Sequence, residues 1–136
     1  MLKQLKLSKT HKLNHPQAFV DLCQAAATEV REVTREYVLS HLNDDTFVLI
    51  DVRDADELAV QGYINNAYHI SKGWIEADIH HAIDDKAKEI VLYCGSGKRS
   101  VLAAFNLKKM GYHNVASLQG GFKGWKSSGL PVETLS

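Results

Sequence analysis

The chain has 136 residues, of which 45% are hydrophobic and 24% are charged. This length suits a single domain that can bury a core without metals or disulfides. Its 16 basic and 16 acidic residues balance, so no overall field favours nucleic acid or an anionic membrane, and we expect neither as a partner. No apolar run approaches the roughly 20 residues of a membrane-spanning helix.

Residues 1–13 carry four lysines and no acidic residue. They lack the uninterrupted apolar core of a secretory signal, and they lack the arginines of a typical transit peptide. We therefore expect a frayed or loosely docked leader. The two cysteines, Cys23 and Cys94, are too few and too far apart for a disulfide framework, which favours a reducing, cytoplasmic location.

A first helix is predicted from Pro16 to Val30, because proline is tolerated in the first turn of a helix. Its apolar residues repeat at helical spacing: Phe19, Leu22, Cys23, Ala26 and Val30. Cys23 on this face is interpreted as a small buried hydrophobe. The helix could pack on its own core or exchange with a second subunit, so the oligomeric state stays open.

Strands and helices alternate through the rest of the chain. Predicted strands lie near Val33 and at 47–50, 67–70, 89–93 and 115–118, and predicted helices at 35–42, 56–61, 74–81, 100–110 and 122–128. This order predicts an α/β domain with a mainly parallel central sheet flanked by helices on both faces. We divide the chain into an N-terminal leader with an extra helix, residues 1–32, and a domain of residues 33–136.

The segment after the strand at 89–93 carries the chemistry. Cys94 follows this buried strand, and Gly95 and Gly97 allow a tight curl before the predicted helix at 100–110. Backbone N–H groups in such a curl, together with a helix N-terminus, form an anion site. That environment favours the reactive thiolate of Cys94, and Lys98 and Arg99 add positive charge. The alternative is a buried cysteine beside an ordinary glycine turn.

Four segments resemble the rhodanese family, in the order that the family has them. Cys94 to Ser100 resembles the active-site loop, and Leu49 to Asp54 resembles the second hallmark of the family. Asp56 to Leu58 together with Gly62 to Ala67 continues the likeness, and Leu118 to Trp125 resembles the closing segment of the family. The departures are Tyr63, where relatives usually have histidine, and Asn65 and Asn66, where they have Pro-Gly.

The resemblance implies a rhodanese-like fold and a sulfurtransferase that works by a ping-pong cycle without a bound cofactor. Cys94 takes sulfur from a donor such as thiosulfate and holds it as a persulfide, and a thiol, a protein or cyanide accepts it. The loop residues Gly95, Ser96, Gly97, Lys98 and Ser100 bind the persulfide. Arg99 orients the loop through carboxylates, and Ser100 caps the following helix. Asp51 and Arg53 brace the site, although a purely structural ion pair is an open alternative.

Two other functions compete with an active sulfurtransferase. One is a non-catalytic binding or regulatory module of the same family, but such modules often lack the cysteine that this chain keeps. The other is a phosphatase or arsenate reductase, whose loop is one residue longer than Cys94 to Arg99. A metal site is not expected, because the adjacent His80 and His81 point in different directions on a helix.

Overall fold

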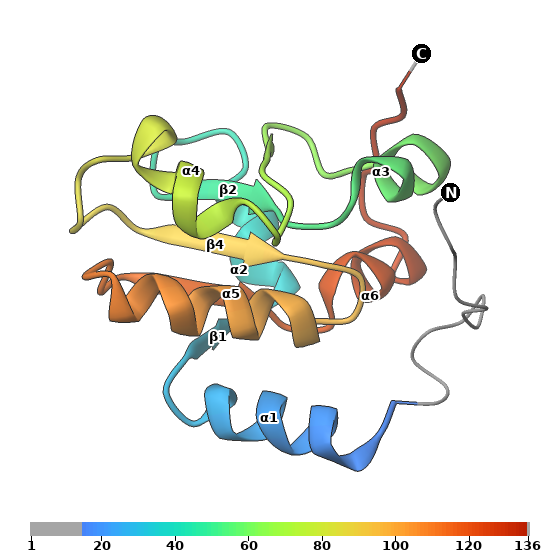
Figure 1. Cartoon of the computed structure of the whole chain (residues 1–136). Helices are drawn as coiled ribbons and strands as arrows, with labels where there is room; N and C mark the ends of the chain where they lie inside the picture. Colours follow the sequence, from blue (N-terminus) through green and yellow to red (C-terminus); the bar gives the residue numbers. More distant parts are fainter. Residues whose placement is uncertain (1–14, 136) are drawn as a thin grey trace, which may run out of the picture.

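The structure is a computed structural model that describes residues 15–135 (Figure 1). The predicted leader at 1–13 lies outside these residues. In the described part, helices and strands alternate as follows: α1 (Gln17–Ala27), β1 (Arg31–Val33), α2 (Arg35–Ser40), β2 (Val48–Asp51), α3 (Ala55–Gln61), β3 (Tyr68–His69), α4 (Ile75–Ala82), β4 (Ile90–Tyr93), α5 (Lys98–Lys109), β5 (Val115–Leu118) and α6 (Gly121–Ser127). Each predicted helix and strand is present, with boundaries that differ by a few residues.

The five strands form one sheet in the order β1-β5-β4-β2-β3, and every neighbouring pair is parallel. This confirms the predicted α/β class with a parallel central sheet. β4 occupies the middle of the sheet, between β2 and β5. In the β2–β4 register, Asp51 lies opposite Tyr93, so the segments that follow these two strands begin side by side at the same edge of the sheet.

The continuous apolar run of β4 is explained by helices on both faces of the sheet. Ile90 and Leu92 join a core cluster with residues of α4 and α5. Val91 and Tyr93 point the other way, into a cluster with residues of α2 and α6. All four side chains are fully buried, as expected for the central strand of a parallel sheet.

Helix α1 forms an additional layer outside α5 (Figure 1). Its buried residues are Cys23 and Ala26, which confirms that Cys23 lies on the packed face. Leu22, which the helical spacing places on the same face, is instead 57% exposed, so the packed face is narrower than predicted. The helix ends at Ala27, three residues earlier than predicted, because the chain turns at residues 28–30 to enter β1. No helix among residues 15–135 is long and apolar enough to span a membrane.

The departure from the family pattern at Asn66 has a structural explanation. Asn66 has φ 68°, the left-handed region that favours glycine and, among other residues, asparagine. Its side-chain amide also donates a hydrogen bond to the carbonyl of Leu42 at 2.8 Å. Asparagine therefore suits this backbone conformation, and it adds a contact to the segment that follows α2.

Candidate active site

The loop after β4 turns into α5 earlier than the sequence predicts. α5 begins at Lys98, and Gly97 precedes it in the left-handed conformation with φ 107°. Glycine adopts this conformation at little steric cost, so the turn is completed at Gly97 and the next residues are already helical. The expectation that Ser100 caps the helix is therefore wrong, because Ser100 is the third residue of α5.

The sulfur of Cys94 points into the curl of this loop. Cys94 Sγ accepts hydrogen bonds from the backbone N–H groups of Gly97 at 3.1 Å and Ser100 at 3.3 Å. The hydroxyl of Ser100 lies 3.4 Å from the same sulfur. Two backbone donors and the N-terminus of α5 thus converge on one buried atom, an arrangement that stabilises negative charge on the sulfur.

The carbonyl groups of the loop are held away from the sulfur by the start of α6. The N–H of Phe122 donates to the carbonyl of Cys94 at 2.8 Å, and the N–H of Lys123 donates to that of Gly95 at 2.9 Å. A Cβ at Gly121 would lie 2.7 Å from both of these carbonyl oxygens. Glycine at 121 therefore permits the close approach that turns the acceptors of the loop outward and leaves its donors facing Sγ.

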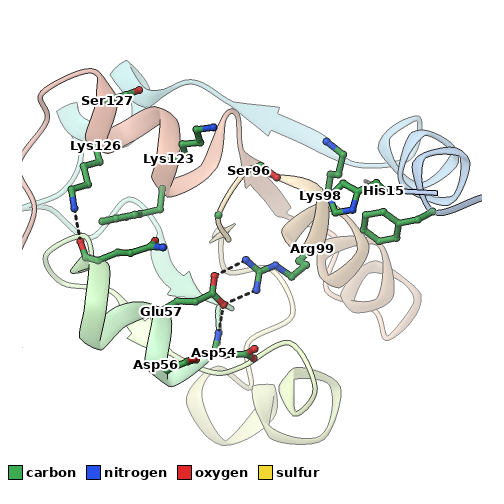
Figure 2. Close-up of a pocket in the computed structure, with 14 residues that line it drawn as sticks. His15, Asp54, Asp56, Glu57, Ser96, Lys98, Arg99, Lys123, Lys126 and Ser127 are labelled. Atoms are coloured by element: carbon green, nitrogen blue, oxygen red, sulfur yellow. Dashed lines mark hydrogen bonds and ion pairs between the residues drawn. The ribbon is translucent and has the colours of Figure 1, made fainter. Parts of the chain in front are cut away.

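Arg99 ties the loop to α3. Its guanidinium donates two hydrogen bonds to the carboxylate of Glu57, at 2.8 and 2.9 Å. The hydrogen bond from Arg99 lowers the pKa of Glu57 below its usual value, although partial burial of the carboxyl opposes this. The same hydrogen bond raises the pKa of Arg99. The geometry agrees with the expected contact of Arg99 with a carboxylate, and Figure 2 shows the two groups pointing toward one another.

Asp51 and Arg53 form a buried ion pair beside the loop. The Arg53 guanidinium donates to Asp51 at 2.7 Å and to the carbonyl of Gly62 at 2.8 Å. It also lies over the ring of Phe122, 4.1 Å from the centroid. Neither Asp51 nor Arg53 contacts Cys94 Sγ, so within the described structure the pair braces the end of β2, the end of α3 and the Phe122 ring.

A cleft of about 780 Å³ opens beside the loop (Figure 2). Four elements line it: the loop with α5 through Gly95, Ser96, Lys98 and Arg99; α3 through Asp56, Glu57 and Gln61; α6 through Phe122, Lys123, Lys126 and Ser127; and the α1 end through His15 and Phe19. Cys94 is 1% exposed and lies behind the loop residues. A substrate sulfur must therefore enter the curl of the loop to meet Sγ.

The charges of the cleft leave two lysines available to an anion. Lys98 and Lys123 line the cleft, and neither forms an ion pair with any residue from 15 to 135. Lys126 instead donates to the carbonyl of Gln61 at 3.1 Å. The opposite wall carries the carboxylates of α3 and its cap, Asp54, Asp56 and Glu57, of which Glu57 is paired with Arg99. The side of the cleft next to the loop is therefore net positive.

The structure adds residues that sequence reasoning did not single out. Glu57 and Gly121 lie in segments that resemble the family, but the sequence alone assigns neither of them a role. Ser117, whose hydroxyl lies 2.7 Å from that of Ser100, gave no signal in the sequence. Trp125 is fully buried and Trp74 is 65% exposed; neither lines the cleft.

No group of three or more His, Cys, Asp or Glu side chains within residues 15–135 has the arrangement of a metal site. The rings of His80 and His81 lie 3.9 Å apart, centroid to centroid, so the expectation that they point in different directions is wrong. No further ligand joins them among residues 15–135.

A family model and two curated proteins that are similar to this chain all indicate the same family. The family model described as Rhodanese-like domain matches residues 34–128. A sulfurtransferase from Allochromatium vinosum is 35% identical over 104 residues, which cover 76% of this chain and 94% of that protein. The thiosulfate sulfurtransferase GlpE of Actinobacillus succinogenes is 36% identical over 104 residues, covering 76% of this chain and 90% of that protein.

Among solved structures, the polysulfide-sulfur transferase homodimer of Wolinella succinogenes resembles this chain with a TM-score of 0.73. The two are 31% identical, and the match covers 88% of this chain and 90% of that one. Such coverage extends beyond residues 34–128 and into the part of the chain that precedes them. The likeness therefore includes residues outside the matched domain.

Proposed function

This chain belongs to the rhodanese family of sulfurtransferases, and we propose that it carries sulfane sulfur as a persulfide on Cys94. The donor is an anionic sulfur compound such as thiosulfate, and the acceptor is a thiol, a protein or, in the test tube, cyanide. The observation that supports this most directly is the pair of backbone N–H groups, of Gly97 and Ser100, that donate to Cys94 Sγ. They favour the anionic sulfur that the reaction requires.

In the first half of the cycle, the Cys94 thiolate attacks the outer sulfur of thiosulfate. A sulfur–sulfur bond forms to Cys94, the bond within thiosulfate breaks, and sulfite leaves with its electron pair. The negative charge moves to the terminal sulfur of the persulfide. The backbone N–H groups of Gly97 and Ser100, which donate to Sγ, would lie next to this position, and α6 holds the carbonyls of Cys94 and Gly95 in other hydrogen bonds. The loop thus acts on sulfur as an oxyanion hole acts on oxygen.

In the second half, the acceptor attacks the terminal sulfur and the Cys94 thiolate leaves. An acceptor thiolate becomes a persulfide, and cyanide becomes thiocyanate. No general base is needed in this scheme, because the nucleophile enters each half as an anion. A reducing compartment such as the cytoplasm would keep Cys94 reduced between cycles.

The size and charge of the cleft bear on the donor. About 780 Å³ is more than a donor of a few atoms fills, and Lys98 and Lys123 offer positive charge at the loop. An inorganic polysulfide is a longer anion with a sulfane sulfur, and the Wolinella succinogenes relative is a polysulfide-sulfur transferase whose likeness extends beyond the family domain. Polysulfide is therefore the second donor that we propose to test.

Two cysteine variants test the proposal. Cys94→Ser is expected to abolish thiocyanate release from thiosulfate and cyanide, whereas Cys23→Ser, a change in the buried face of α1, is expected to leave it largely intact. If the wild-type chain forms no thiocyanate with either thiosulfate or polysulfide, the non-catalytic module becomes the better reading. If Cys94→Ser stays active, Cys94 is not the sulfur carrier.

A further inference from the structure

A buried hydroxyl lies where the sheet meets the active-site loop. Ser117 is in β5, whose four residues are all buried, and its side chain is completely inaccessible. In the sheet register it lies opposite Leu92 of β4, two residues before Cys94. Residues of a strand alternate between faces, so Ser117 points to the same face as Leu92, toward α5. A hydroxyl in such a place is costly unless it is hydrogen-bonded.

Ser117 has one hydrogen-bond partner among residues 15–135, the hydroxyl of Ser100 at 2.7 Å. If Ser100 donated this bond, the proton of Ser117 would point into the core without an acceptor. The arrangement that satisfies both groups has Ser117 donating and Ser100 accepting. The single proton of Ser100 is then free for another acceptor.

Two acceptors lie within reach of the Ser100 proton. The carbonyl oxygen of Gly97 is at 3.2 Å, which is long for a bond between oxygens. Cys94 Sγ is at 3.4 Å, an ordinary distance for the larger sulfur atom. A negative charge on the sulfur strengthens a hydrogen bond to it. The hydroxyl of Ser100 is therefore best placed to donate its hydrogen bond to the thiolate of Cys94.

We infer that Ser117 is a positioning residue for the nucleophile: it donates to Ser100 and thereby directs the Ser100 hydroxyl at the thiolate of Cys94. The inference rests on the proposed function, in which this thiolate attacks the donor. The chain of hydroxyls gives the sulfur a third donor beside the N–H groups of Gly97 and Ser100. Once the persulfide forms and the inner sulfur is neutral, the Ser100 proton can turn to the Gly97 carbonyl without breaking its bond to Ser117.

The test is the pH dependence of alkylation of Cys94 by iodoacetamide, followed by mass spectrometry on the full chain carrying Cys23→Ser. The charged groups around the sulfur stay constant in this series: Lys98 and Arg99 of α5, and Glu57 of α3, which pairs with Arg99. Cys23, the other titratable group that interacts with Cys94, is replaced by serine in every variant. Ser117→Ala is expected to move the midpoint of the profile to higher pH and to slow alkylation below it about three- to tenfold, because a midpoint one pH unit higher lowers the thiolate fraction about tenfold.

A double-mutant cycle separates the relay from a general effect on the core. Ser117→Ala should add nothing in a Ser100→Ala background, and Ser117→Thr, which keeps the hydroxyl, should restore most of the wild-type profile. An unchanged profile in Ser117→Ala, or an equal shift with and without Ser100, would overturn the inference. Thermal unfolding of each variant checks that it folds. If the alanine variant does not, Ser117→Thr and Ser117→Val, which have the same shape with and without the hydroxyl, give the same comparison.

Alkylation does not depend on sulfur transfer, so this result and that of the proposed function can be told apart. A coupled shift of the alkylation profile in a chain that never releases thiocyanate would support the hydroxyl relay and contradict the sulfurtransferase proposal. A chain that releases thiocyanate but shows no coupling between Ser117 and Ser100 would support the sulfurtransferase proposal and contradict the hydroxyl relay.

Discussion

Arg99 in the first turn of α5 and Glu57 in the first turn of α3 are joined by two hydrogen bonds, of 2.8 and 2.9 Å. Glu57 also accepts from the backbone N–H of Asp54 at 2.9 Å, closing the capping box of α3. One carboxylate thus fixes the start of α3 and, through Arg99, the helix that follows the cysteine loop. The loop is thereby anchored on two sides, by α3 at Arg99 and by α6 at its carbonyls.

Removing the Glu57 carboxylate should loosen the loop without removing any group that touches sulfur. We expect Glu57→Ala to lower kcat/KM for thiocyanate formation about tenfold, the cost of a lost positioning contact of about 1.4 kcal/mol. Glu57→Gln, which keeps one acceptor oxygen, should lose less. Asp56→Asn is the matched control, because Asp56 lines the same cleft but forms no ion pair with any residue from 15 to 135. Equal losses in the Asp56 and Glu57 variants would show that cleft charge, not the link to Arg99, matters.

The same pair predicts how stability changes in acid. The pKa of Glu57 is lower in the folded chain than its ordinary value of 4.5, chiefly through the hydrogen bond from Arg99. The stabilisation is therefore fully present above about pH 4.5 and is lost as the pH falls through the lower folded value. Urea unfolding of the wild type and Glu57→Gln between pH 7 and pH 3 should give free energies that converge as the pH falls. A difference that grows in acid would contradict the assignment.

Gly121 should tolerate no side chain. Alanine there would place a Cβ 2.7 Å from the carbonyl oxygens of Cys94 and Gly95, at φ +59°. We expect Gly121→Ala to cost about 2 kcal/mol or more of unfolding free energy and to abolish most activity. Gly129→Ala is the control, since Gly129 has φ +75° but no atom within 4 Å of its added Cβ. It should lose about 1 kcal/mol and keep its activity. Similar activity losses in both variants would point to backbone strain alone.

Helix α1 should affect which acceptor reacts, not the reaction itself. Phe19 lines the cleft together with His15, and the two rings lie 4.8 Å apart. Phe19→Ala should raise KM for a peptide thiol about three- to tenfold through loss of about 1 kcal/mol of apolar contact. Cyanide is too small to reach this wall, so its kinetics should not change. Leu22→Ala, on the exposed side of the same helix at 57% exposure, is the control. An equal rise in KM for cyanide would show that Phe19 supports the fold and does not contact the acceptor.

Most of the fold was predictable because local patterns determine it. The four apolar residues of β4 predict a strand buried on both faces, and the glycines after Cys94 predict a loop with inward N–H groups. The order of strands in the sheet was not predictable in this way. It depends on contacts between segments far apart in the sequence, such as β1 with β5.

The parts of the site that the sequence missed are tertiary contacts. Glu57 and Arg99 are 42 positions apart, and Ser100 and Ser117 are 17 apart; nothing in the local sequence links them. The error at Ser100 is of another kind. Serine is a favoured N-cap, but a left-handed glycine at 97 starts the helix before Ser100 is reached. The Ser100 hydroxyl is therefore not used as a helix cap and lies within hydrogen-bond distance of Cys94 Sγ.

The most direct test of the central claim is the intact mass of the purified chain after incubation with thiosulfate, followed by peptide mapping and then by addition of cyanide. We expect the gain of one sulfur atom on the peptide that contains Cys94, its loss when cyanide is added, and release of an equal amount of thiocyanate. A chain that gains no sulfur from thiosulfate or polysulfide, or gains it only at Cys23, would contradict sulfur transfer through Cys94.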